Sequence, residues 1–483
     1  MLLNGLDCRE ISLSKVLSDK VCDFRLEAEY YSKIYEKLSV NLNKNHLVEL
    51  STLVKSKITT GHTPSMKNEK FYGGNISFIK TDNLRDNFIK APFSDYLSEL
   101  GDEKIKNSRL KEFDIITTII GATYKIIGRS CLINTTMLPA NINQNIALIR
   151  ADIKKINPYY LNVYMQSLYG KLYLHWLSRQ TEQVNLNCEE VGKLKVARFS
   201  NLFEERLAEL NQKSYKLNII SNEKYSQAEN LLIAELGLEN FNPSSEKVSI
   251  KTIKESFLKT GRLDSEYYQV KYDEYLQKIK LNKYTTISNE FGLIKEKIKN
   301  GLGSYNYVEI GDVNVSDGKS SPKVMDEKDL PANAKIMPQK GDLLVSKVRP
   351  NRGAISIIEE DYSNLVVSGA FTVLREKKES NYRIETLKTL LRTPVYSDWL
   401  LKFNVGTSYP VITDEDILSL PIPIIKFNVQ DEIASYIKQS MEYLKKAKDL
   451  LDISVKAVEI AIEKDEQSAQ NFLDRQSDAN CLL

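Results

Sequence analysis

The chain has 483 residues, of which 42% are hydrophobic and 27% are charged, and its formal net charge is only +3. This length predicts about three domains, or two with long connecting segments. The small net charge excludes a uniformly basic protein that coats nucleic acid, although it remains compatible with local basic clefts.

One heptapeptide occurs twice in the chain. Residues 25–31 read RLEAEYY and residues 262–268 read RLDSEYY, about half a chain length apart. Solenoid repeats have periods of roughly 20–50 residues, so this longer offset predicts two copies of a domain-sized unit. A short amphipathic helix pattern follows each copy. We therefore assign residues 1–46 to an N-terminal helical segment of the first repeat and residues 246–283 to the leading segment of the second.

A mixed α/β segment follows in each half. Short β-like runs punctuated by Gly and Asn, such as those at 114–120 and 342–346, predict strands. Each segment also contains one helix candidate, at residues 158–177 and 384–403. Each candidate contains one of the chain's two tryptophans, Trp176 and Trp399, which we interpret as core anchors. Each segment closes with an apolar strand, at 194–197 and 420–424.

Two long helices follow the mixed segments, within residues 201–245 and 427–465. Spacings that alternate between three and four residues are typical of a coiled-coil seam. The first seam comprises Leu207, Leu210, Ser214, Leu217, Ser221, Lys224, Ala228 and Leu231, and the second comprises Ile433, Ile437, Ser440, Leu444, Ala447, Leu451, Ser454, Val458 and Ala461. Lys224 either fixes the register or marks a seam drawn slightly wrong. We expect the two helices to pack antiparallel within one chain, with a coiled coil between two chains as the alternative. Residues 466–483 are expected to form a polar, frayed tail.

Residue patterns that carry catalysis are sparse. Three dispersed histidines form no metal-ligand pattern, and neither a P-loop nor a G-x-S-x-G elbow occurs. Residues 157–160, NPYY, lack the second proline of the Asp/Asn-Pro-Pro-Tyr/Phe motif of amino-methyltransferases, so we interpret Asn157 as a helix cap. We interpret residues 102–104, DEK, as part of a solvated face. We therefore predict that the chain is not an enzyme and itself binds neither a metal ion nor a cofactor.

The sequence predicts neither a membrane protein nor a secreted one. No apolar run reaches the roughly 20 residues of a membrane span, and the first residues lack signal-peptide architecture. The five cysteines are scattered and include no C-x-x-C pair, so we expect no disulfide framework and no zinc site. A cytoplasmic location follows as an expectation.

Both halves contain short motifs that a known family shares. Residues 60–65, TGHTPS, and 71–79, FYGGNISFI, are similar to that family's G-x-T-P-S and Y-x-G-x-I-x-W-I motifs, with Phe78 where Trp is common. The second half lacks the first motif. Its residues 341–346, GDLLVS, and 421–423, PIP, are similar to the family's G-D-I/L-L and I/L-P-I/L-P strands. Over essentially its whole length, the chain resembles the specificity subunit of type I restriction-modification systems.

The resemblance implies an α+β fold with a pseudo-twofold internal repeat. Two mixed α/β target recognition domains, residues 47–200 and 284–426, would be separated by two long antiparallel coiled-coil helices. Each domain would read one half of a bipartite, asymmetric target in double-stranded DNA, and the helices would act as a ruler. Two modification subunits, which bind S-adenosylmethionine and methylate adenine, would dock on the helices. Two motor-nuclease restriction subunits, which use ATP and Mg, are optional further partners.

Candidate DNA contacts lie on loops that mix basic, hydroxyl and amide side chains. Base edges are read by hydrogen-bond donors and acceptors, whereas Lys and Arg hold phosphates. The candidates in the first half are Lys57, Thr60, His62, Thr63, Ser65, Lys67, Tyr124, Lys125, Arg129, Asn143, Gln144 and Asn145. Those in the second half are Lys297, Lys299, Lys347, Arg349, Asn351, Arg352, Thr407, Ser408 and Tyr409.

Simpler interpretations of these loops and of the whole chain stay open. The amides at 143–145 could bond their own backbone in a turn, and the Arg-rich segment 347–352 could be a plain solvated loop. The alternatives for the whole chain are a solitary DNA methyltransferase or nuclease with unrecognised motifs, and a protein-binding scaffold. Binding of S-adenosylmethionine by the purified chain would favour the enzyme. Absence of salt-dependent duplex binding would favour the scaffold.

Overall fold

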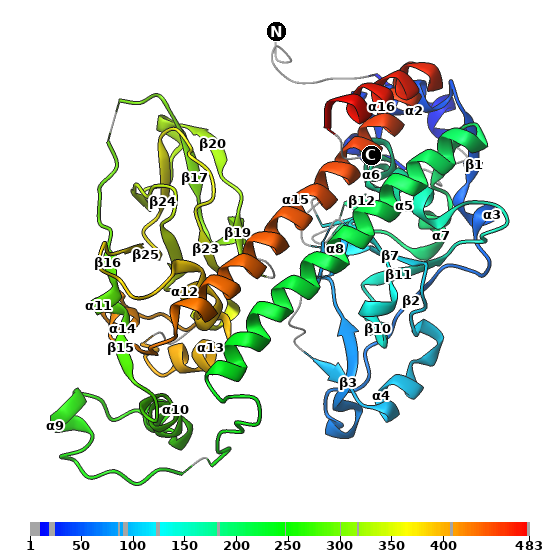
Figure 1. Cartoon of the computed structure of the whole chain (residues 1–483). Coiled ribbons are helices and arrows are strands. Elements are labelled where there is room, and N and C mark those ends of the chain that lie inside the picture. The colour runs from blue at the N-terminus through cyan, green and yellow to red at the C-terminus, as the bar shows by residue number, and fades with distance from the viewer. Residues whose placement is uncertain are drawn as a thin grey trace. The chain divides into compact units, whose positions relative to one another are not determined.

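The computed structural model describes residues 10–18, 25–85, 87–89, 95–121, 126–180, 184–246, 248–299, 301–315, 318–405 and 409–480. The chain divides into two compact units, many of whose elements are labelled in Figure 1: unit 1 comprises residues 1–219 and 443–483, and unit 2 comprises residues 220–442. Both units mix helices with strands, so the expected α+β class is confirmed. Of the described helices, none is long and apolar enough to cross a membrane.

Unit 1 is built around a four-stranded antiparallel sheet in the order β2-β11-β7-β9. A three-stranded sheet in the order β10-β3-β6 packs beside it. The strands of unit 1 are β1 (His46–Glu49), β2 (Thr59–Thr60), β3 (Tyr72–Ile79), β4 (Leu84–Arg85), β5 (Phe88–Ile89), β6 (Tyr96–Leu97), β7 (Asp114–Thr118), β8 (Ile120–Gly121), β9 (Ser130–Leu132), β10 (Ala140–Ile142), β11 (Ile146–Arg150), β12 (Arg179–Gln180), β13 (Val184–Asn185) and β14 (Lys195–Arg198). Its short helices are α1 (Leu13–Ser18), α2 (Lys33–Leu42), α3 (Leu50–Leu53), α4 (Glu99–Lys104), α5 (Pro158–Gln166), α6 (Leu168–Leu177) and α7 (Cys188–Gly192).

Unit 2 repeats this plan with a four-stranded antiparallel sheet in the order β16-β25-β22-β23 and a second sheet in the order β20-β17-β24-β21. Its strands are β15 (Tyr284–Thr286), β16 (Phe291–Leu293), β17 (Ser304–Val308), β18 (Val313–Asn314), β19 (Lys319–Ser320), β20 (Lys323–Asp326), β21 (Ala334–Ile336), β22 (Leu343–Ser346), β23 (Ile355–Ile357), β24 (Leu365–Ser368), β25 (Phe371–Glu376) and β26 (Pro421–Pro423). Its short helices are α9 (Phe257–Thr260), α10 (Val270–Lys280), α11 (Ile287–Glu290), α12 (Ile384–Arg392), α13 (Pro394–Leu401) and α14 (Asp414–Leu418).

The sheets β2-β11-β7-β9 and β16-β25-β22-β23 are each packed on both faces, which explains the continuous apolar runs in their central strands. Side chains alternate along a strand, so Ile115 and Ile149 lie in the helical core of unit 1 while Ile116 and Leu148 lie in the core shared with the second sheet. The same alternation divides β22 of unit 2 between two cores. The helices therefore cover one face of each sheet and leave its edges to the loops.

The internal repeat extends to individual polar pairs. In unit 1, Arg150 donates two hydrogen bonds to Asp114, at 2.7 and 2.8 Å, between β11 and β7. In unit 2, Arg375 donates two to Asp342, also at 2.7 and 2.8 Å, between β25 and β22. Each buried carboxylate raises the pKa of its arginine through these hydrogen bonds. The two units thus share a scaffold that the heptapeptide alone could only suggest.

The two copies of the heptapeptide perform the same structural task. Arg25 donates to the carbonyls of residues 177–178, at 3.1 and 2.9 Å, where α6 ends. Arg262 donates to the carbonyls of residues 403–404, at 3.3 and 2.7 Å, just after α13. Carbonyls at a helix C-terminus lack intrahelical donors and favour a positive charge. The repeated arginine therefore satisfies the end of one helix in each unit.

The two helix candidates of the mixed segments are each broken into two helices. Residues 158–177 form α5 and α6, and residues 384–403 contain α12 and α13. Ser167 and Thr393 interrupt them, because each takes an extended backbone and its hydroxyl accepts a hydrogen bond from the next helix, at Gly170 and Tyr396 respectively. The expected single helices were wrong because hydroxyl N-caps inside an apolar run were read as helix interior.

The two tryptophans anchor cores but occupy different positions in the repeat. Trp176 stacks on Tyr30 at a ring-centroid distance of 5.5 Å and donates to its carbonyl at 3.0 Å. Trp399 is 3% exposed and packs against Tyr396 at 5.5 Å. Counted from the N-caps of α6 and α13, the residue equivalent to Trp176 is Lys402, whose ammonium lies 4.8 Å from the ring centroid of Tyr267.

The long helices α8 (Asn201–Glu235) and α15 (Phe427–Glu463) contribute to both units. In unit 1 the Ser214 hydroxyl donates to the Ala447 carbonyl at 2.6 Å, and in unit 2 the Ser221 hydroxyl donates to the Ser440 carbonyl at 2.7 Å. The small side chains at these positions therefore let the two backbones approach closely within each unit. Lys224 lies over the Tyr436 ring at 5.2 Å, so the interruption in the first seam is occupied by a cation–π contact.

The predicted helix-packing residues differ in their burial. Fully buried are Leu207, Leu210, Ile433, Ile437 and Val458, and half-buried are Leu217, Leu231, Leu444 and Leu451. Near the C-terminal half of α15 the apolar stripe is wider than the predicted seam, because Leu450 and Ala457 are buried as well. There the helix packs against the globular part of unit 1 as well as against α8.

The expected frayed tail at 466–483 was wrong for the residues that the structure describes. Residues 466–480 form α16 (Glu466–Asn480), with Ala469 and Leu473 both 0% exposed in the core of unit 1. Arg206 on α8 forms an ion pair with Asp474 at 2.8 Å. The sequence analysis missed this helix because the segment is mostly polar and only one narrow stripe of the helix is apolar.

Candidate nucleic-acid interface

In unit 1, the topology brings three loops that carry candidate DNA contacts to one edge of the four-stranded sheet. Strands β2 and β7 end there, at Thr60 and Thr118, and strands β9 and β11 begin there, at Ser130 and Ile146. Residues 61–71, 119–121, 126–129 and 143–145 leave or enter the sheet at that edge. Segments that are far apart in the sequence therefore form one loop surface, which we call edge 1.

Two of the loops on edge 1 are tied together. The Thr63 hydroxyl donates a hydrogen bond to the Gln144 side-chain oxygen, and Gly61 N donates to Ile146 O at 3.3 Å. A Cβ atom at Gly61 would lie 1.8 Å from the Ile142 carbonyl oxygen. Only glycine therefore fits at this position of the TGHTPS segment, which explains the glycine in physical terms.

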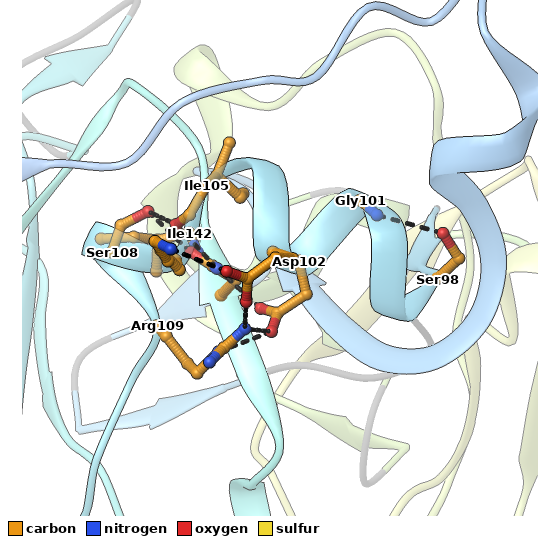
Figure 2. A network of polar contacts seen from close by, with 10 residues as sticks. Ser98, Gly101, Asp102, Ile105, Ser108, Arg109 and Ile142 are labelled. Atoms are coloured by element: carbon orange, nitrogen blue, oxygen red, sulfur yellow. Dashed lines mark hydrogen bonds and ion pairs between the residues drawn. The ribbon is translucent and has the colours of Figure 1, made fainter.

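The amide cluster at 141–145 separates into structural and exposed members. Buried Asn141 donates to Asp102 at 2.9 Å, and Asp102 also accepts from Arg109 at 2.5 Å, a network shown in Figure 2. Asn143 is buried and accepts from the backbone of Asn145 at 3.2 Å, which is the turn interpretation. Gln144 remains exposed, so it is the member of this cluster that is available to a base edge.

The network in Figure 2 corrects the interpretation of residues 102–104 as a solvated face for Asp102 alone, because Glu103 and Lys104 are exposed as expected. Asp102 is only 5% exposed. It holds α4 against β10 through Asn141 and holds Arg109 on its other oxygen. The hydrogen bond with Asp102, which is the largest effect, and the hydrogen bond with Glu103 raise the pKa of Arg109. Asp102 therefore has a structural role at this edge of the second sheet.

Of the remaining described candidates of the first half, four are exposed and four are half-buried. Exposed are Lys57, His62, Ser65 and Lys67, and half-buried are Thr60, Thr63, Arg129 and Asn145. Lys57 precedes β2. Burial, the larger effect, raises the pKa of the Cys188 thiol, and the charge of Lys57 partly offsets this rise. Tyr124 and Lys125 lie outside the described residues.

In unit 2, the equivalent edge of the sheet gathers the equivalent loops. Strands β16 and β22 end there, at Leu293 and Ser346, and strands β23 and β25 begin there, at Ile355 and Phe371. We call the resulting surface edge 2. The two edges share backbone contacts: Ile119 N donates to Asn145 O at 3.0 Å on edge 1, and Lys347 N donates to Ala370 O at 2.9 Å on edge 2.

Edge 2 brings Arg349 and Tyr409 together from two separately predicted loops. The Arg349 guanidinium carbon lies 5.4 Å from the Tyr409 ring centroid, and Arg349 N donates to Pro410 O at 2.7 Å. Arg349 has a φ of 49°, in the left-handed region that non-glycine residues rarely adopt. The segment 409–411 thus supports an exposed arginine. Thr407 and Ser408 lie outside the described residues.

The other basic candidates on edge 2 differ in how they are engaged. Lys347 forms an ion pair with Asp414 at 3.0 Å, so its charge is already matched within the protein. Lys299 forms an exposed ion pair with Glu296 at 3.3 Å, and a pair of this kind contributes little stability and is easily exchanged for a phosphate. Lys297, Asn351 and Arg352 are exposed.

The structure adds two residues to edge 2 that the sequence analysis missed. The β24–β25 turn at Gly369 lies beside Asn333 and Lys335, because a Cβ at Gly369 would lie 3.1 Å from the Asn333 side-chain oxygen and 3.0 Å from the Lys335 side chain. The Asn333 amide donates to the Ser368 hydroxyl at 2.6 Å. Both residues are exposed. No motif marks them, since only the pairing of β21 with β24 brings them to this edge.

The described side chains on both edges offer hydrogen-bond donors, hydrogen-bond acceptors and cations. Among the described residues, no three His, Cys, Asp or Glu side chains gather in a way that could hold a metal ion. Arginine, lysine, glutamine and asparagine side chains on loops are the groups that contact phosphates and base edges. The arrangement is suited to binding a polyanion at two places.

The chain is similar to known proteins. Residues 274–450 match the family described as the type I restriction modification DNA specificity domain. An alignment with the HindI type I restriction enzyme specificity subunit of Haemophilus influenzae is 25% identical over 185 residues, which is 37% of this chain and 38% of that relative. The chain therefore aligns with less than two thirds of the relative's length.

Solved structures of the same class also align. The crystal structure of the S subunit of a type I restriction-modification system from M. genitalium aligns with 88% of this chain and 96% of its own, at 10% identity and a TM-score of 0.40. The crystal structure of the HsdS subunit from Thermoanaerobacter tengcongensis aligns with 87% of this chain and 97% of its own, at 13% identity and a TM-score of 0.29.

Proposed function

We propose that this chain, which is related to type I restriction-modification specificity subunits and carries their DNA specificity domain at residues 274–450, reads a bipartite DNA target with its two units. Edge 1 contacts one half-site and edge 2 contacts the other. The chain supplies recognition and no chemistry of its own. Its location in the cytoplasm belongs to the same proposal.

The observation that carries the proposal is the repetition of one sheet edge with different side chains. Both edges present loops from the same positions of the same sheet topology. Edge 1 displays His62, Thr63 and Gln144, whereas edge 2 displays Arg349 and Arg352. A shared scaffold with unlike surfaces is what an asymmetric target with two different half-sites requires.

The partners follow from the same proposal. Two modification subunits, which supply S-adenosylmethionine and methylate adenine, dock on the helical segments α8 and α15. Restriction subunits, with ATP and Mg, join that core where the system has them. Residues 157–160, NPYY, lack the second proline of the Asp/Asn-Pro-Pro-Tyr/Phe motif of amino-methyltransferases, which supports the assignment of methyl transfer to a partner rather than to this chain.

Methylation mapping of DNA from cells that express the chain together with a modification subunit tests the proposal. We expect methylated adenines within one bipartite sequence and none when either protein is absent. Binding of the purified chain to duplex DNA should also weaken steeply with salt, because cations on the protein displace counterions from phosphates. Methyl transfer by the rigorously purified single chain would contradict the proposal.

A further inference from the structure

One arginine joins three separate segments of unit 2. Arg392, the last residue of α12, donates from Nη1 to the Gly353 carbonyl and from Nη2 to the Val315 carbonyl, both at 2.8 Å. Its Nε donates to the Tyr225 hydroxyl on α8 at 2.7 Å. Gly353 ends the loop that displays Arg349 and Arg352 on edge 2. Arg392 therefore connects that loop to the long helix.

The contact with α8 continues beyond the hydroxyl group. Tyr225 hydrogen-bonds Glu229, one turn further along the same helix. A phenol can accept one hydrogen bond while donating another, so the tyrosine links the guanidinium to a carboxylate. The Arg392 guanidinium also lies against the Tyr225 ring, at 5.5 Å from the centroid. Burial, the largest effect, raises the pKa of Glu229, while the charge of Arg392 and the hydrogen bond with Tyr225 act in the opposite direction.

The surroundings leave little room for this arginine to move. Gly318, in the turn between β18 and β19, has a φ of 68°, and a Cβ there would lie 2.7 Å from Cε of Lys388 and 3.1 Å from Nη1 of Arg392. Lys388 is itself only 1% exposed. The guanidinium is therefore held between the β18–β19 turn, the edge-2 loop and α8, with one planar group serving all three segments.

In unit 1, different residues connect the loop end and α8 to the rest of the unit. Counted from the N-caps that follow α5 and α12, Gln166 is the equivalent of Arg392, and its amide donates to the Ser130 carbonyl at the end of the 119–129 loop. Helix α8 contacts the sheet of unit 1 through another residue, Tyr215, whose hydroxyl donates to the Leu132 carbonyl at 3.0 Å. Only in unit 2 does one described side chain contact both the loop end and α8.

We propose that Arg392 is a positioning residue for half-site recognition by unit 2. It fixes the loop 347–353 relative to α8 without touching DNA itself. The inference rests on the proposed function, because it assigns the edge-2 loop to a half-site. Its consequence is that the bases chosen by unit 2 depend on a hydrogen bond formed behind the reading surface.

The test measures discrimination separately at the two half-sites with full-length protein. Binding to the cognate duplex is compared with binding to duplexes that carry single-base mismatches in one half-site or the other. Arg392→Lys keeps the charge but cannot span three acceptors. We expect discrimination at one half-site to fall roughly tenfold, as for the loss of a bidentate base contact, and discrimination at the other half-site to stay unchanged.

Two further variants separate positioning from general stability. Tyr225→Phe removes only the hydroxyl that accepts from Arg392, and we expect it to reduce discrimination at the same half-site by a smaller factor while the melting temperature changes little. Arg383→Lys, at the start of α12, is the matched control. Its ion pair with Asp431 is exposed at 3.2 Å, so we expect no loss at either half-site.

The outcomes distinguish this inference from the function on which it rests. If the wild-type protein discriminates at neither half-site, the proposed function fails. If the wild type discriminates and both Arg392→Lys and Tyr225→Phe retain its full discrimination, the positioning role is wrong. Equal losses at both half-sites, with a lowered melting temperature, would reduce Arg392 to a stabilising residue and also overturn the proposal.

Discussion

Arg349 shows how a single residue can be kept in an unfavourable backbone conformation. Its φ of 49° costs an L-residue roughly 1–2 kcal/mol relative to the right-handed region. The hydrogen bond from Arg349 N to Pro410 O and the contact with Tyr409 hold it there. Such outliers concentrate at functional sites. A glycine would relieve the strain, so the presence of arginine is consistent with selection for its side chain.

Arg349→Gly should therefore separate binding from stability. We expect recognition of one half-site to weaken by about 1–3 kcal/mol if the guanidinium contacts guanine. The free energy of unfolding should change little, because relief of backbone strain offsets the lost cation–π contact of about 0.5–1 kcal/mol. Duplex binding and chemical denaturation measure the two quantities.

Arg352→Ala is the companion variant, since Arg352 is exposed with an ordinary backbone. It too should weaken one half-site only. A uniform loss over all DNA sequences would assign these arginines to phosphates, and no loss at all would remove the loop from the interface.

Lys402 occupies the place that Trp176 holds in the other unit, and its charge is unfavourable there. Burial, the largest effect, lowers the pKa of its ammonium group. A folded-state pKa below the unfolded value means that the charged form destabilises the fold. That penalty is fully present below the folded pKa and is relieved as pH rises through it towards the unfolded value.

Lys402→Met should consequently raise the free energy of unfolding at neutral pH. The gain over the wild type should shrink as pH rises through the window just below the ordinary lysine pKa, because the wild-type ammonium then loses its charge. Denaturation of both proteins across this range measures the difference. A gain that is independent of pH would attribute the effect to packing rather than to charge.

At the scale of elements, the sequence predicted what periodicity encodes and missed what tertiary contacts decide. The spacing of Leu207, Leu210 and Ile437 predicted two long helices, which are present as α8 and α15. The break at Ser167 was missed, because a hydroxyl in an apolar run looks like helix interior. Helix α16 was missed because its buried stripe, Ala469 and Leu473, is hidden among polar residues.

The candidate interface shows the same division between local and tertiary information. Composition predicted the loops that reach each edge, since Gly, Asn and Lys mark them. It could not decide that Asn141 is buried or that Lys347 is already paired with Asp414. It also missed Asn333 and Lys335, which only strand pairing brings beside Gly369. Whether these side chains contact DNA stays a prediction.

Leu473→Ala tests whether α16 belongs to the core of unit 1. Leu473 is 0% exposed, so its truncation should lower the free energy of unfolding by about 2–5 kcal/mol through lost burial and a residual cavity. Arg475→Ala, an exposed change on the same helix, should stay within about 0.5 kcal/mol of the wild type. Equal effects in denaturation experiments would show that the helix does not contribute to the core.

At the scale of the whole molecule, two serine contacts define which residues of α8 lie opposite which residues of α15 within each unit. Ser214 contacts Ala447 in unit 1, and Ser221 contacts Ser440 in unit 2. Between these contacts each helix is continuous. Under the proposed function, the length of helix between the two contacts sets the spacing of the half-sites.

Lengthening both helices should change that spacing. Four residues inserted in α8 between Ser214 and Ser221, and four in α15 between Ser440 and Ala447, preserve both contacts and add about 6 Å of helix. At about 3.4 Å per base pair, we expect the preferred spacer to grow by roughly two base pairs. Methylation mapping with a partner subunit would reveal the change.

The half-site sequences themselves should stay as they were in that experiment. Insertion in α8 alone is the control, and it should lower stability because the two serine contacts can no longer form together. An unchanged spacer in a folded, active double-insertion protein would exclude the helices as the ruler.

Unit 1 draws on both ends of the sequence, which has a consequence for synthesis on the ribosome. Unit 2 is one continuous stretch, 220–442, whereas the core of unit 1 includes Leu450, Ala457 and Leu473. At translation rates of roughly 5–20 residues per second, the first 219 residues wait on the order of ten seconds or more for that final segment. During this interval the apolar side chains of unit 1 that later cover Leu450 and Leu473 remain uncovered. The nascent chain is therefore most vulnerable to aggregation through its first-made half, and we expect unit 2 to finish folding before unit 1.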